Sequence, residues 1–402
     1  MAIIALGLRE AKLRRQIRAH LGSLGFTRDK EGLLVAPNLD KEGYRALHRG
    51  QKAHRFGAET RFIEARAQHL LPHFANGAEI DVNRITIRLI PIVQGTWQSD
   101  LFRLATLLWS VPVSMGFGRR LRFLVWDAHA ERLVGLLALG DPVFNLRARD
   151  ALVGWTALER ESRLVHMLDG YVVGAVPPYN KLLGGKLVAC LMRSREIVDE
   201  FRRRYASTEG VISGERRNAH LVAVTTSSAL GRSSIYNRLR LDGTSYLESI
   251  GYTGGYGHFH FPQTLFDDIR SYLRYRKDPY ASNNRFGSGP NWRFRAIRRT
   301  LHLLGLNPHL IKHGLPREVF IGRLADNAIE ILSGKRKRPR YDSLRTVSEV
   351  AELALDRWIR PRAARDDSYL HFMRADLNEF FEARVTKSVV TALGKRRGSG
   401  PR

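Results

Sequence analysis

The chain has 402 residues, 66 Lys and Arg against 39 Asp and Glu, and a formal net charge of +27 at pH 7. This length predicts two or three domains, and the charge predicts a polyanionic partner, of which nucleic acid is the commonest in a cytoplasm. A single cysteine, Cys190, excludes internal disulfides and multi-cysteine zinc sites, and no apolar run is long enough to cross a membrane.

The first 95 residues are predicted to form a small helical head. Apolar side chains recur at three- and four-residue steps over 8–24, which is typical of an amphipathic helix. A short strand at 33–35 leads to a second, basic helix around Tyr44 and Leu47. Helix, wing and basic helix resemble compact nucleic-acid-binding heads, and the same pattern also fits any small helical domain.

Residues 96–276 are predicted to form a central α/β domain. Two apolar runs, 121–127 and 132–141, flank a turn and indicate an antiparallel hairpin. Further strands are expected at 171–173 and 220–226 and in the alternating GYGHFHF run. Helices are expected after Gly184 and over 235–241 and 265–275. This order predicts a mixed central sheet and an α/β (α+β) fold.

A basic helical region is predicted for 277–385. The segment 277–293 is rich in Gly, Pro, Ser and Asn and reads as a linker. Helices are expected over 294–304, 319–331 and 347–358. The last residues, 386–402, are predicted to be a disordered basic tail.

A glycine-bearing turn follows the strand at 171–173. Two prolines stop that strand, and Lys181, Gly184, Gly185 and Lys186 then lead into an apolar helix. Strand, turn and helix N-terminus is the plan of an anion-binding site. An ordinary strand-to-helix crossover, with glycine for close packing, fits the same residues.

Four side chains are candidates for chemistry. Asp141 and Asp150 are a carboxylate pair that could bind a metal or move a proton, or could serve only in local turns and ion pairs. Tyr236 and Tyr246 could act as general acids, and a buried aromatic is the alternative for each. No His, Cys, Asp and Glu spacing defines a metal site, so none is predicted.

Clusters of basic residues are the candidate nucleic-acid-binding elements. They are separate in sequence and would form a phosphate-tracking surface if some of them converge, whereas each taken alone fits a solvated surface. The clusters are Arg119, Arg120, Arg216, Arg217, Lys335, Arg336, Lys337 and Arg338.

Three long phrases carry a family resemblance across roughly residues 1 to 385. They are LVGLLALGDPVFNLRARDALVGW, YVVGAVPPYNKLLGGKLVACL and TTSSALGRSSIYNRL followed by YLESIGYTGGYGHFHFP. The chain resembles the DruA family of Druantia anti-phage defence systems. The resemblance implies a bacterial cytoplasmic protein that works against phage with partner subunits, including a large helicase-like one.

The central domain is also similar to the acetyltransferase fold, which implies acetyl-coenzyme A as a cofactor. Lys181, Gly184 and Lys186 stand where that fold has a pyrophosphate-binding loop, and Lys186 departs from the small residue expected there. The first function hypothesis is therefore a nucleic-acid-binding defence subunit. The alternatives are an acyltransferase-like enzyme and a metal-dependent nuclease.

Overall fold

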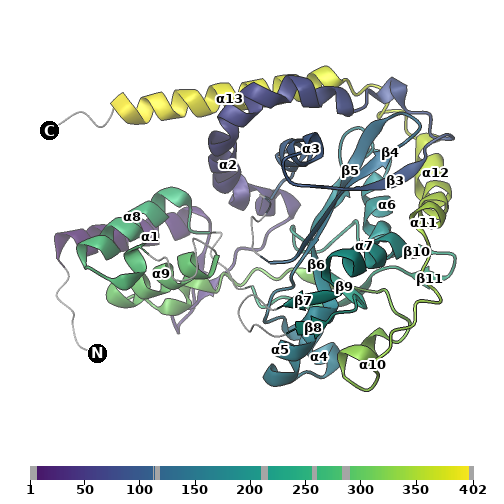
Figure 1. The fold of residues 1–402 in the computed structure, drawn as a ribbon. Coiled ribbons are helices and arrows are strands. Elements are labelled where there is room, and N and C mark those ends of the chain that lie inside the picture. The colour runs from purple at the N-terminus through teal and green to yellow at the C-terminus, as the bar shows by residue number, and fades with distance from the viewer. Residues whose placement is uncertain are drawn as a thin grey trace.

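A seven-stranded sheet with helices on both faces stands beside a separate helical lobe (Figure 1). The computed structural model describes residues 7–111, 113, 118–209, 216–255, 260–282 and 290–397. Within these residues no helix is long and apolar enough to cross a membrane.

The large sheet has the strand order β12-β13-β9-β6-β5-β4-β3. Every neighbouring pair is antiparallel except β6 and β9, which are parallel. Its strands are β3 (Ile87–Pro91), β4 (Arg120–Asp127), β5 (Arg132–Gly140), β6 (Met167–Ala175), β9 (Ala223–Ser227), β12 (Glu248–Tyr252) and β13 (Glu318–Arg323). Short two-stranded pairs are β1 (Thr27–Arg28) with β2 (Leu34–Val35), β7 (Ser207–Glu209) with β8 (Arg216–Asn218), and β10 (Arg240–Leu241) with β11 (Thr244–Ser245).

Helices cover both faces of the sheet, because its middle strands are apolar on both sides. In β5, all residues after Arg132 are buried, as expected for a central strand packed on two faces. One face packs against α2 (Lys41–Leu70), α3 (Trp97–Thr106) and α13 (Arg374–Arg397). The other face packs against α6 (Gly184–Leu191), α7 (Arg195–Tyr205) and α11 (Val347–Ala354). Smaller helices at the sheet are α4 (Arg147–Val153), α5 (Ala157–Arg163), α10 (Ala328–Leu332), α12 (Arg360–Ala363) and the π-helical turn Leu355–Ile359.

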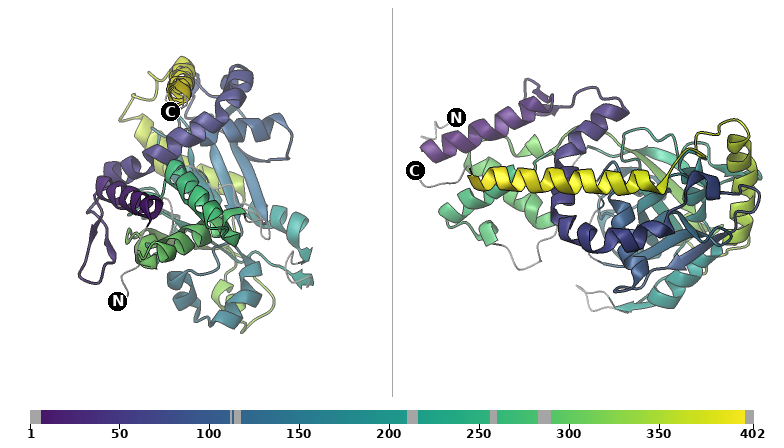
Figure 2. Two further views of the ribbon diagram at one scale, coloured as in Figure 1. Left: turned by 90° about the vertical axis from the view of Figure 1, so that its left-hand side faces the viewer. Right: turned by 90° about the horizontal axis from the view of Figure 1, so that it is seen from above.

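The helical lobe joins segments from two distant parts of the chain. Its core combines α1 (Leu8–Ser23) with α8 (Gln263–Tyr275) and α9 (Pro290–Leu303). The α1 core residues Leu13, Ile17 and Leu21 lie at the spacing that the sequence predicts for an amphipathic helix. Figure 2 shows these helices grouped beside the sheet. The lobe therefore contains both N-terminal residues and residues from beyond 260.

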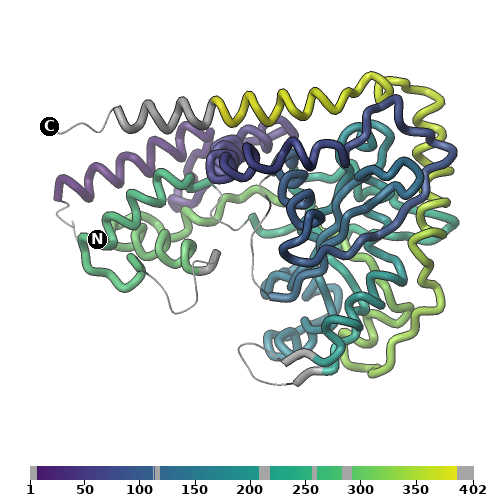
Figure 3. Tube along the Cα trace, turned by 45° about the horizontal axis from the view of Figure 1, so that its top comes forward, coloured from purple at the N-terminus to yellow at the C-terminus, as the bar shows by residue number. Residues whose placement is uncertain are grey.

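One long helix, α2, connects the lobe to the sheet. It has 30 residues, and its N-cap is Asp40, whose carboxylate accepts a hydrogen bond from the Gly43 N–H at 2.8 Å. Its first turns contribute Tyr44 to the lobe core, and its later turns contribute Ile63 to the core under the sheet. At 1.5 Å per residue such a helix is about 45 Å long. In Figure 3, α13 runs beside it.

The structure corrects the predicted helix at 319–331. Residues Glu318–Arg323 instead form β13, which lies between β9 and β12 in the sheet. Its apolar part, Val319–Ile321, is only three residues long, so its sequence alone does not separate a buried strand from a buried helix. Within the predicted span, only the first residues of the short helix α10 are helical. The predicted helical region 277–385 thus contains a central strand of the sheet.

The predicted helix at 235–241 is also wrong. Ser233 Oγ accepts hydrogen bonds from the N–H groups of Ile235 and Tyr236, as a helix N-cap would. The chain then takes a left-handed conformation at Arg238, with φ 60°, and pairs β10 with β11. Part of the expected GYGHFHF strand, residues 256–259, lies outside the described residues.

The remaining predicted elements are largely present. The hairpin forms β4 and β5, and the glycine-bearing turn joins β6 to α6. Helix α13 continues to Arg397, into the segment that was expected to be a disordered tail. The mixed central sheet and the α/β (α+β) class are confirmed.

Candidate nucleic-acid interface

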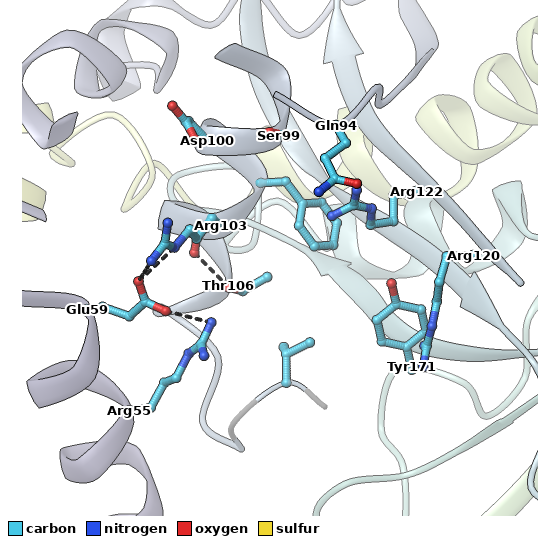
Figure 4. Close-up of a pocket in the computed structure, with 12 residues that line it drawn as sticks. Arg55, Glu59, Gln94, Ser99, Asp100, Arg103, Thr106, Arg120, Arg122 and Tyr171 are labelled. Carbon is cyan, nitrogen blue, oxygen red and sulfur yellow. Dashed lines mark hydrogen bonds and ion pairs between the residues drawn. The ribbon is translucent and has the colours of Figure 1, made fainter. Parts of the chain in front are cut away.

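A cavity of about 560 Å³ lies between α2, α3 and the sheet, and arginines line it on opposite sides (Figure 4). Four arginines and two carboxylates contribute to its wall, so positive charge is in excess. Figure 4 shows Arg55, Glu59 and Arg103 on the helical wall and Arg120, Arg122 and Tyr171 on the sheet wall. We call this cavity the arginine cleft. Its other lining residues are Gln94, Ser99, Asp100, Phe102, Thr106 and Val113.

Arg120 reaches across the sheet to stack on Tyr171. Its guanidinium carbon is 4.3 Å from the centre of the Tyr171 ring, although β5 separates their two strands. The path crosses Gly140, where an added Cβ would lie 2.9 Å from the guanidinium carbon of Arg120. Glycine at this position therefore leaves the space that the arginine occupies.

A β-bulge sets the position of Tyr171. Gly170 pairs with Leu139 and Val172 with Ala138, so Tyr171 has no partner on β5. Bulges of this kind redirect a side chain and often lie next to functional sites. Burial raises the pKa of the Tyr171 hydroxyl, which therefore stays protonated at neutral pH and keeps its capacity to donate a hydrogen bond.

Arg122 forms no ion pair with a carboxylate of the described residues, whereas Arg55 and Arg103 both pair with Glu59. It lies two residues after Arg120 in β4, so both side chains project from the same face of the sheet. Its guanidinium carbon is 5.6 Å from the centre of the Phe102 ring. Each arginine of the sheet wall thus lies over an aromatic ring. The ring holds the planar guanidinium group in place, so less side-chain entropy is lost when a ligand binds.

Glu59 holds the two arginines of the helical wall. Its side chain is 4% exposed, and its carboxylate accepts from Arg55 at 2.8 Å and from Arg103 Nε at 2.7 Å. Arg103 also lies 4.0 Å from the centre of the Phe62 ring. A buried carboxylate between two guanidinium groups leaves a net positive charge on this wall.

Arg120 lines the cleft, whereas its predicted neighbour Arg119 is held in internal contacts. Arg119 Nε donates to Asp141 at 2.6 Å, and Nη1 donates to the Val165 carbonyl at 2.6 Å. Its side chain is 13% exposed. The two residues face opposite ways because successive side chains of an extended segment alternate.

The other predicted basic residues do not line the cleft. Lys335, Arg336, Lys337 and Arg338 form an exposed loop after α10, where Asn327 fixes the backbone through hydrogen bonds to residues 338 and 340. The side chains of Arg216 and Arg217 lie outside the described part of the chain; only the backbone of β8 is described there.

The two candidate carboxylates are each engaged with arginine. Asp141 pairs with Arg119, and Asp150 pairs with Arg149 at 2.7 Å and with Arg160 at 2.9 Å. Within the described residues, no group of three or more His, Cys, Asp and Glu side chains could hold a metal ion. A nuclease role for Asp141 and Asp150 stays a prediction.

The predicted anion site lies at the start of α6, and its lysines contact the C-terminal segment. Lys181 Nζ donates to the Ser368 carbonyl at 2.9 Å. Lys186 Nζ is 5.3 Å from the centre of a Trp358 ring, and burial lowers the pKa of this lysine. The two lysines therefore join α6 to residues 355–370.

The two glycines of this site differ in how closely they are packed. A Cβ at Gly184 would lie 2.7 Å from the Tyr179 carbonyl oxygen, which explains glycine there by packing alone. A Cβ at Gly185 would lie 3.5 Å from Ile235. Anion binding at this turn stays a prediction.

The two candidate tyrosines lie in different surroundings. Tyr236 packs edge-on against Phe320, and burial raises the pKa of its hydroxyl to about 12. Tyr246 is buried, and the guanidinium carbon of Arg193 lies 5.4 Å from its ring centre. Neither side chain lines the arginine cleft.

Sequence reasoning missed most of the cleft. Arg55 and Glu59 come from α2, Arg103 from α3, and Arg122 and Tyr171 from two strands that are not neighbours. One local signal was present, because RLR at 120–122 places two arginines on one face of an apolar strand. The convergence with α2 depends on long-range packing.

Comparison with known proteins identifies the family. The model of the family described as Druantia protein DruA matches residues 38–334. The chain is 53% identical over 378 residues to the Druantia protein DruA of Escherichia coli (strain UMEA 4076-1), covering 94% of each chain. No solved structure matches. This chain therefore belongs to the DruA family, which confirms the resemblance and implies a component of an anti-phage defence system.

Proposed function

We propose that this chain is the nucleic-acid-binding subunit of a Druantia anti-phage defence system, and that the arginine cleft is its main binding site. The observation that carries the proposal is the pair Arg120 and Arg122, which project from one strand into a cavity of about 560 Å³. Arginine is well suited to this role because its planar fork matches phosphate oxygens.

Charge across the chain supports the same partner. A net charge of +27 attracts polyanions over distances of about a Debye length, which is farther than direct contacts reach. Helix α1, in the predicted N-terminal head, would add to this surface, since its Lys12, Arg15 and Arg18 are exposed. The exposed loop at 335–338 would add a second, weaker contact.

The proposal includes partner subunits in the bacterial cytoplasm, among them a helicase-like protein. A subunit that holds nucleic acid in a cleft would present the strand to such an enzyme. Co-purification of this chain with the other subunits, with and without nuclease treatment, tests whether the association depends on nucleic acid.

The binding proposal is tested by fluorescence anisotropy with labelled DNA and RNA at increasing salt. Each phosphate that the protein neutralises contributes about −0.7 to −0.9 to the slope of log affinity against log salt. We expect Arg120→Gln with Arg122→Gln to weaken binding about tenfold or more and to flatten the slope by about 1 to 2.

The charge-matched control is the double variant Arg202→Gln with Arg203→Gln. Both residues are exposed on α7, which packs on the opposite face of the sheet. This pair should flatten the slope less and leave the affinity within about threefold of the parent protein. Equal losses from both pairs would show that charge alone, and not the cleft, sets the affinity.

A second candidate is an acyltransferase-like enzyme, and the parallel pair of strands favours it. β6 pairs with β9 only as far as Gly170 and Thr226, and the rest of β6 pairs with β5 alone. β6 thus extends beyond the end of β9 on the side where α6 begins, which is where the proposed coenzyme would bind. A rise in melting temperature with acetyl-coenzyme A, lost in Gly185→Glu, where a Cβ makes only ordinary contacts, would support this candidate. An unchanged melting temperature at saturating coenzyme would eliminate it.

A further inference from the structure

The size of the arginine cleft limits what can enter it. A cavity of about 560 Å³ lies within the range of roughly 300–1,000 Å³ that proteins use for a single small ligand. A DNA duplex is too large to enter a cavity of this volume, since its major groove alone is about 12 Å wide. One nucleotide that has left a base stack is of the right size.

The walls of the cleft offer the two kinds of contact that an unpaired nucleotide uses. Such nucleotides stack their bases on aromatic rings or on the planes of arginine side chains, and their phosphates bind cations. The sheet wall has both, because Arg120 lies over Tyr171 and Arg122 lies over Phe102. Arg122, with no acidic partner in the described structure, has its charge available for a phosphate.

We infer that the arginine cleft binds one unpaired nucleotide of a nucleic-acid strand. Its phosphate lies against Arg122, and its base stacks on the layer formed by Arg120 and Tyr171. Arg55 and Arg103, held by Glu59, supply positive potential from the opposite wall. This inference rests on the proposed nucleic-acid binding and makes it specific for single strands or for bases that leave a duplex.

The first test compares three ligands on the full-length protein: an oligothymidine, a hairpin duplex of similar charge, and free thymidine monophosphate. The oligothymidine should bind about tenfold more tightly than the duplex at the same salt concentration. The mononucleotide should compete only weakly, because it lacks the phosphates that contact the rest of the basic surface. If it displaces the strand at comparable concentration, the ligand is a free nucleotide and the inference is overturned.

Two variants at Tyr171 separate stacking from folding. Tyr171→Phe keeps the ring and should bind single strands as the parent protein does. Tyr171→Leu keeps apolar volume without a ring and should lose about tenfold for single strands but little for duplex. Melting temperatures of both variants verify that they are folded. Equal single-strand affinities for the Phe and Leu variants would overturn the stacking role.

A photo-crosslink locates the strand directly. An oligonucleotide carrying 5-iodouracil, irradiated in complex, should attach to a peptide that contains Tyr171 or Phe102, as mass spectrometry would show. Attachment confined to the 335–338 loop would contradict the inference while leaving nucleic-acid binding intact. Absence of binding to every nucleic acid at low salt would remove both the inference and the proposed function.

Discussion

The guanidinium of Arg120 lies 4.3 Å from the centre of the Tyr171 ring, and it crosses Gly140 to reach it. Three strands therefore contribute to one contact. Strand β4 carries the arginine, β5 carries the glycine that leaves space for it, and β6 carries the tyrosine ring. The β-bulge at Tyr171 completes the arrangement. This dependence on several strands makes the contact sensitive to changes in residues that touch no ligand.

Gly140→Ala should disturb this contact. The new methyl group would lie 2.9 Å from the Arg120 guanidinium carbon, so the arginine must move away from Tyr171. We expect a several-fold loss in single-strand affinity and a loss of about 1 kcal/mol in the free energy of unfolding. Anisotropy and urea denaturation measure the two effects.

Gly50→Ala is the matched control, because nothing lies within 4 Å of a Cβ at this position in the middle of α2. It should stabilise the protein by about 0.5–1 kcal/mol and leave binding unchanged. The Gly140 interpretation fails if Gly140→Ala binds single strands as tightly as Gly50→Ala does.

Glu59→Gln removes the carboxylate between Arg55 and Arg103. Breaking a buried ion pair leaves charge uncompensated, so we expect the free energy of unfolding to fall by about 3 kcal/mol. The same change adds one net positive charge to the cleft and should steepen the salt dependence of binding. Glu42→Gln, in an exposed pair with Arg45, should cost less than about 1 kcal/mol. Equal destabilisation by the two substitutions would contradict the buried role of Glu59.

Stability should decrease in mild acid because three histidines resist protonation. Burial lowers the pKa values of His48, His166 and His260 to about 4, below the ordinary value of 6.5. The unfolded chain therefore binds more protons below pH 6.5, and each histidine destabilises the fold by up to about 2 kcal/mol at pH 5.

Asp169 has the opposite effect. Burial raises the pKa of its carboxyl group to about 6, so the folded chain binds the extra proton and gains stability as the pH falls from 6 toward 4. Urea denaturation at pH 7 and pH 5 measures the net change, which we expect to be a loss. His260→Asn should reduce that loss, and an unchanged pH dependence in this variant would exclude His260 as a contributor.

Neutralising the exposed loop should affect all nucleic acids alike. Lys335→Gln with Lys337→Gln removes two charges that lie away from the cleft, so the salt slope should flatten by at most about 2. The ratio of single-strand to duplex affinity should stay the same. If this pair abolishes binding that the Arg120 and Arg122 changes leave intact, the loop is the binding site.

The sequence predicts local elements better than it predicts the site. The hairpin of β4 and β5 and the helix α1 follow from apolar spacing and turn residues, which act over a few residues. The strand β13 does not, because its partners β9 and β12 lie far away in the chain and only pairing with them distinguishes a strand from a helix. The sequence predicts Arg120 as a binding residue because it forms a basic pair with Arg119. Tyr171 was placed in a strand, but its bulge depends on the register between β5 and β6.

The continuous helix α2 connects the helical lobe directly to one wall of the arginine cleft. Tyr44 anchors one end of the helix in the lobe, Ile63 anchors the other end under the sheet, and Arg55 and Glu59 lie between them. A rigid helix transmits a rotation of either end to its middle. A partner that binds the lobe therefore contacts the same continuous helix that holds Arg55 and Glu59.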